Sequence, residues 1–76
     1  MTEHEWLVIE IIRMFESLGF DDTYIKSKRD ELIGRDRLAV LQWCSNLDDL
    51  CLSVLCNRVG IQLEDFKVTL ETLKKL

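Results

Sequence analysis

Apolar residues recur at helical spacing along most of the chain. Between residues 62 and 75 they follow one another at intervals of three and four positions, as Leu63, Phe66, Leu70 and Leu73. On an α-helix this spacing gives one narrow stripe, which suits packing against a single neighbour. No segment alternates apolar and polar residues in the way that a half-buried strand requires. The pattern therefore predicts an all-α fold.

Capping residues and glycines divide this pattern into helices. The glycines at positions 19, 34 and 60 each follow an apolar run, where glycine commonly ends a helix. Thr2 and Glu5 have the spacing of a capping box, and the aspartates at positions 21, 22 and 36 are placed to begin the next two helices. These signals predict a compact bundle of four to five short helices over residues 3–18, 22–33, 37–44, 46–59 and 62–75.

The boundary between the third and fourth predicted helices has two interpretations. Ser45 or Asn46 can cap a separate helix, with Asp48 and Asp49 in its first turn, where carboxylates interact favourably with the helix dipole. Alternatively, residues 36–59 form one long, bent helix, because the sequence contains no proline to interrupt them.

Two of the predicted helices carry more apolar surface than one small bundle can bury. In residues 3–18 the polar positions form only a strip, and residues 46–59 are apolar around most of their circumference. Either the helix over 46–59 is central and the first helix is merely well covered, or the first helix also packs against a second subunit. The second interpretation predicts a twofold homodimer that a charge at Ile9 or Ile12 would disrupt.

Length and charge limit the possible partners and location of the protein. A chain of 76 residues is sized for one helical domain, residues 1–76, and its stability as a monomer is small. A net charge of −4 argues against general binding to nucleic acid or to anionic membranes. No apolar run is long enough to span a membrane, and the acidic opening MTEHEW lacks the basic start of a secretory signal. With three cysteines in no framework spacing, we expect a cytoplasmic protein with reduced thiols.

Few side chains have catalytic or metal-binding potential. His4 is the single histidine and has no fixed partner, which makes it a poor general base. Cys44, Cys51 and Cys56 lack the close pairs and the fourth ligand of a zinc site, so we expect them to be small buried apolar residues. The sequence contains no phosphate-binding glycine loop and no nucleophile motif. We expect a non-enzyme without catalytic residues, metal or cofactor.

Residues 52–71 resemble a helix-turn-helix. Apolar, small and glycine residues fall where that motif needs them, at Leu55, Cys56, Val59, Gly60, Ile61 and Phe66. The resemblance implies a DNA-binding transcriptional regulator whose second helix reads bases, and this is the alternative function. Glu64 and Asp65 at the start of that helix would repel phosphates, whereas recognition helices usually carry Arg, Lys, Asn or Gln there. The sequence therefore favours a helical corner that supports the core or binds a protein.

Basic and aromatic residues give the candidates for a protein-binding surface. Residues 24–37 contain five basic and three acidic residues, a net charge of +2, which fits a solvated face or a docking site for an acidic protein. Aromatic side chains dominate interface hot spots. We expect a protein partner, rather than nucleic acid or a membrane, to contact residues of this belt, the aromatics and the first helix: Trp6, Ile9, Ile12, Tyr24, Lys28, Arg29, Arg35, Arg37 and Trp43.

The make-up of the chain is similar in style to the small helical inhibitors and antirepressors that phages and prophages encode. It is short, acidic and tolerant of cysteine, as they are. This similarity implies a small non-catalytic regulator that binds a protein partner and inhibits or redirects it. It depends on composition and size, and no motif contributes to it.

Overall fold

Five α-helices make up the described part of the chain in a computed structural model, which covers the backbone of residues 3–75 and the side chains of residues 5–75. The helices are α1 (Glu3–Ser17), α2 (Asp22–Leu32), α3 (Arg37–Cys44), α4 (Asp49–Val59) and α5 (Leu63–Lys74). Residues 3–75 contain no strand, so the predicted all-α bundle is confirmed. Thr2 of the predicted capping box and the side chain of His4 lie outside the described residues.

An aspartate side chain caps the start of α2, of α3 and of α4. Asp21, Asp36 and Asp48 each accept a hydrogen bond of 2.8 Å from the backbone N–H group three residues later. Each of these bonds satisfies a donor that has no partner within its own helix. The predicted caps at Asp21 and Asp36 are confirmed.

The chain breaks between α3 and α4, so the single bent helix over residues 36–59 is excluded. The predicted cap at Ser45 or Asn46 is wrong, because residues 45–47 continue in tight turns, each N–H group donating to the carbonyl three residues earlier. Asp48 is the cap, since its backbone is extended (φ −74°, ψ 171°). The hydrogen bond from the Cys51 N–H group lowers the pKa of the Asp48 carboxyl. This cap therefore stabilises the fold above the pKa of an unfolded aspartate and is lost as pH falls through the lowered value.

A Schellman motif ends α1 and fixes the path into α2. Gly19 has a φ of +82°, a conformation that costs glycine little. The N–H group of Gly19 donates to the carbonyl of Glu16, and the N–H group of Phe20 donates to the carbonyl of Phe15. The rings of Phe15 and Phe20 meet edge to face at 5.1 Å between centroids. This is the apolar contact that commonly accompanies the motif, and it places Phe20 beside the start of α2.

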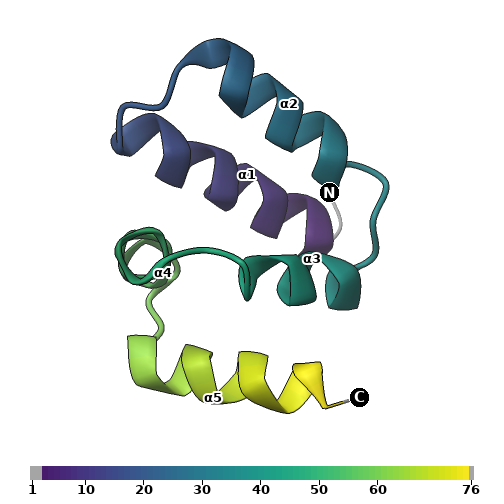
Figure 1. Cartoon of the computed structure of the whole chain (residues 1–76), viewed down its shortest axis with the longest axis vertical. Helices are drawn as coiled ribbons and strands as arrows, with labels where there is room; N and C mark the ends of the chain where they lie inside the picture. The colour runs from purple at the N-terminus through teal and green to yellow at the C-terminus, as the bar shows by residue number, and fades with distance from the viewer. Residues whose placement is uncertain (1–2, 76) are drawn as a thin grey trace.

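Helix α1 is the centre of the bundle. It packs against α2, α3 and α4, and in Figure 1 α2 runs back alongside it. The interpretation that residues 46–59 form the central helix is wrong, because α4 packs mainly on two helices, α1 and α5, and leaves Leu50 63% exposed. Helix α5 lies on both α3 and α4, so its stripe serves two neighbours instead of the single one predicted.

The core is built around α1. Its inner face and the facing sides of α2, α3 and α4 contribute side chains that are almost completely buried, namely Ile11, Met14, Phe15, Leu32, Val40, Cys44 and Leu55. A charged residue is also buried: Glu10, on α1, is 8% exposed. Its Oε2 atom accepts a hydrogen bond of 3.0 Å from Nε of Arg58, on α4. This ion pair links the central helix to α4.

Candidate protein-interaction surfaces

The predicted partner-binding residues lie on three separate surfaces. They are divided between two flanks of α2 and one corner of the bundle, because adjacent positions on a helix point in different directions. The first flank holds Tyr24, Lys28, Arg35 and Trp43; the groove between α1 and α2 holds Ile9, Ile12 and Arg29; the corner holds Trp6 and Arg37.

Two stacked aromatic rings lie exposed on the first flank. Phe20 and Tyr24 stack at 5.0 Å between ring centroids with an interplanar angle of 25°, and they are 38% and 40% exposed. Phe15 packs edge-on against both rings from the core. The ammonium group of Lys28 lies 5.3 Å from the centroid of the Tyr24 ring, within cation–π range. We call Phe20, Tyr24 and Lys28 the aromatic platform.

Glu31 anchors the side chains next to the platform. Its carboxylate accepts a hydrogen bond of 3.1 Å from the indole N–H of Trp43 and pairs with Lys28 at 3.4 Å. The Trp43 hydrogen bond is the main cause that lowers the pKa of Glu31, and Lys28 and Arg35 act in the same direction. Arg35 also donates from Nε to the backbone carbonyl of Glu31 at 2.9 Å. Trp43 is half-buried, so it supports this flank more than it presents a ring to a partner.

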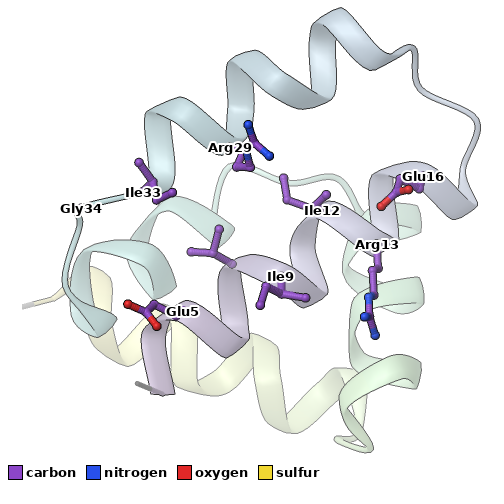
Figure 2. A pocket seen from close by; sticks show the side chains of 9 residues that line it. Glu5, Ile9, Ile12, Arg13, Glu16, Arg29, Ile33 and Gly34 are labelled. Carbon is purple, nitrogen blue, oxygen red and sulfur yellow. The ribbon is translucent and has the colours of Figure 1, made fainter. Parts of the chain in front are cut away.

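A long apolar groove runs between α1 and α2 on their other side (Figure 2). Its larger, more apolar part has a volume of about 500 Å³, with Val8, Ile9 and Ile12 on α1 and Ile33 at the end of α2. A second hollow of about 320 Å³ continues it along the hairpin and shares Ile12 with it. The charged side chains of the two hollows are Glu5, Arg13, Glu16, Asp22, Lys26 and Arg29. We call the two hollows together the α1–α2 groove.

The corner between α4 and α5 holds a smaller apolar pocket. In Figure 1 α4 is seen end-on and α5 lies across the view, so the two helices cross steeply, as in a helix-turn-helix. Gly60 ends α4 with a φ of +76°, and the Gly60 and Ile61 N–H groups both donate to the Cys56 carbonyl. The pocket, of about 200 Å³, has Trp6 and Arg37 in its wall together with Leu7, Leu41, Leu55, Val59, Ile61 and Phe66.

The outer face of α5 has an acidic start. Glu64 and Asp65 are exposed in its first turn. Lys67 follows them on α5 and forms an ion pair of 3.0 Å with Asp49 at the start of α4. The positive charge of Lys67 is therefore partly neutralised within the fold.

All three cysteines are buried, as predicted, and none of them forms a disulfide. Burial raises the pKa of the Cys44 thiol to about 12 and that of Cys51 to about 11, with the Asp48 carboxylate adding to the rise at Cys51. Among the described residues, no group of three His, Cys, Asp or Glu side chains is placed to hold a metal ion. No helix in this part of the chain is both long and apolar enough to cross a membrane.

The cysteines should react very slowly in the folded protein. The thiolate is the reactive form, so burial, which raises the pKa of Cys44 to about 12, leaves much less of this thiol in the reactive form at pH 8 than an exposed thiol would have. We expect a chromogenic disulfide reagent to label the native protein slowly, and Cys44 last, and to label all three thiols at once in urea. Rapid native labelling of Cys44 would show that this part of the core opens readily.

Phe20 and Ile33 are exposed apolar residues of these surfaces that were not among the predicted contacts. Phe20 completes the aromatic stack, and Ile33 forms one edge of the groove while remaining 63% exposed. Both residues adjoin a helix-ending glycine. For Phe20 a signal was present, because the residue after a Schellman glycine often packs back on the helix. For Ile33, the sequence predicts only that the second helix ends at this residue, and it does not show whether a neighbour covers the side chain.

In comparisons with known proteins, no family model, curated protein or solved structure shows a significant match to the chain.

Proposed function

We propose that this chain is a small non-catalytic regulatory protein that binds another protein and inhibits or redirects it. The aromatic platform is the proposed contact surface. The observation that carries the proposal is the exposed, stacked pair of Phe20 and Tyr24 with Lys28 over the Tyr24 ring. Aromatic rings in this setting are the side chains that most often dominate the energy of protein interfaces.

The platform is held in place before any partner arrives. The Schellman turn fixes the backbone at Phe20, and the Phe15 ring contacts both exposed rings from the core. Binding would therefore cost little conformational entropy, because these side chains are already ordered in the free protein. A low entropy cost favours affinity. Lys28 at one edge favours a partner surface that places an apolar side chain on the rings and a carboxylate beside them.

The alternative, DNA reading by α5, has less support. The steep crossing of α4 and α5 is compatible with a helix-turn-helix (Figure 1). However, Glu64 and Asp65 are exposed where the helix would meet DNA, and Lys67 is paired with Asp49. Binding to phosphates depends on releasing counterions with clustered Lys and Arg, and this tip carries the opposite charge.

Affinity capture from a nuclease-treated lysate, repeated at low and high salt, tests the proposal. We expect the wild type to retain one stoichiometric protein in both conditions. Tyr24→Ala should weaken binding of that purified protein about 30-fold, which corresponds to the loss of a hot-spot side chain worth about 2 kcal/mol.

Val68→Ala is the matched control, because Val68 is an apolar residue 66% exposed on the outside of α5. It should leave the affinity unchanged. Recovery of nucleic acid alone, lost at high salt and after Lys67→Ala, would support DNA reading instead. A protein partner retained equally by Tyr24→Ala would place the contact on another surface.

A further inference from the structure

We infer that the α1–α2 groove is the interface of a homodimer, covered by the α1–α2 hairpin of a second copy of this chain. The groove and the aromatic platform lie on opposite flanks of α2. The inference therefore does not depend on the proposed function, and such a dimer leaves both platforms accessible.

The groove lies along a side of the central helix that its own helices leave open. Helices α2, α3 and α4 pack against the rest of α1. On the open side, Ile9 and Ile12 are only half-buried and Ile33 is 63% exposed. The groove follows α1 from Glu5 to Glu16, about 16 Å at 1.5 Å per residue, which is the length of three helical turns. An apolar groove of this length fits another helix.

The charged side chains around the groove include both signs in equal number, so one copy of the groove can be electrostatically complementary to another. Its acidic side chains are Glu5, Glu16 and Asp22, and its basic side chains are Arg13, Lys26 and Arg29. Three acids and three bases give the groove no net charge, although the whole chain carries −4. A twofold interface brings one patch against its own copy, so a rim of a single sign would repel itself. The balance of signs favours a second copy over a strongly charged partner.

The groove also combines a hollow and a projection, as a twofold interface requires. Ile9 and Ile12 line the hollow, while Ile33 projects at its edge from the end of α2 (Figure 2). Each copy can then insert Ile33 toward the hollow of the other. Two antiparallel hairpins packed in this way make a four-helix arrangement, which is a common way to bury paired helices.

The size of the molecule is compatible with such an interface. A stable interface buries about 800 Å² on each partner. The chain has an accessible surface of 5068 Å², so the dimer would cover about one sixth of it, or roughly one face.

Sedimentation velocity over a wide range of concentration, with light scattering after gel filtration, tests the inference. We expect the wild type to have twice the mass of the 9.0 kDa chain. Ile33→Asp should raise the dimer dissociation constant at least 100-fold, because it places a carboxylate in the apolar contact. Ile33 is exposed at the end of α2, so this variant should retain the circular dichroism of the wild type.

Ile9→Asp should give the same loss of mass, and Val68→Asp is the matched control on the far helix, expected to leave the dimer intact. A wild type that is monomeric at every concentration would overturn the inference, as would a dimer that survives both groove variants. The inference would also be overturned if the protein were a monomer that binds a different protein through the groove. In that case Ile33→Asp would abolish the binding and Tyr24→Ala would retain it.

Discussion

Phe15→Ala is expected to destabilise the protein by about 3–5 kcal/mol, the usual cost of removing a buried phenylalanine ring. Phe15 is 2% exposed at the centre of the bundle, and its ring contacts Phe20, Tyr24 and Trp43 edge to face. A chain of this length has a free energy of unfolding of roughly 4–11 kcal/mol, so this one change removes much of it. Urea unfolding followed by circular dichroism measures the loss.

Phe15→Leu is the matched variant. It keeps most of the apolar volume and should cost about 1–2 kcal/mol while removing the three edge-to-face contacts. The measurements need one fixed protein concentration, because the stability of a dimer depends on it. A Phe15→Ala protein as stable as Phe15→Leu would contradict the description of this ring as the centre of the core.

Arg58→Ala is expected to cost about 1–3 kcal/mol, because it leaves the Glu10 carboxylate buried without its main partner. Glu10 is 8% exposed, and its second cationic neighbour, Arg13, lies further away at 3.9 Å. The double variant of Glu10→Ala with Arg58→Ala should cost clearly less than the sum of the two single changes.

The ion pair of Lys67 and Asp49 is a control matched in distance. It also measures 3.0 Å, but its side chains are 42% and 78% exposed, whereas those of Arg58 and Glu10 are 32% and 11% exposed. An exposed pair contributes about 0–1 kcal/mol, so its double-variant cycle should show little coupling. Equal coupling in the two cycles would contradict the structural role assigned to Glu10.

The helices were predictable because their signals are local. Asp21 and Asp36 cap helices through their own neighbours, and the glycines at positions 19 and 60 end helices in the left-handed conformation. The cap of α4 was misplaced by two to three residues because Ser45, Asn46 and Asp48 have similar capping propensity. Only the turns after α3 decide between them.

The surfaces were only partly predictable, because they depend on how helices pack. Lys28 and Arg29 are adjacent in the sequence, yet one lies on the aromatic platform and the other in the α1–α2 groove. The basic belt is therefore divided between two faces, and Glu31 engages two of its members, Lys28 and Arg35. The central place of α1 was equally hidden, since two helices carry similar apolar coverage and composition does not rank them.

Site-specific photo-crosslinking in cells that contain the natural partners tests directly whether the aromatic platform binds a protein. A photoreactive phenylalanine analogue replaces Tyr24 in one strain, Val68 in a second and Glu64 in a third. We expect one discrete protein adduct from position 24 and none from position 68. No adduct at position 24, or an adduct to nucleic acid at position 64, would contradict this expectation.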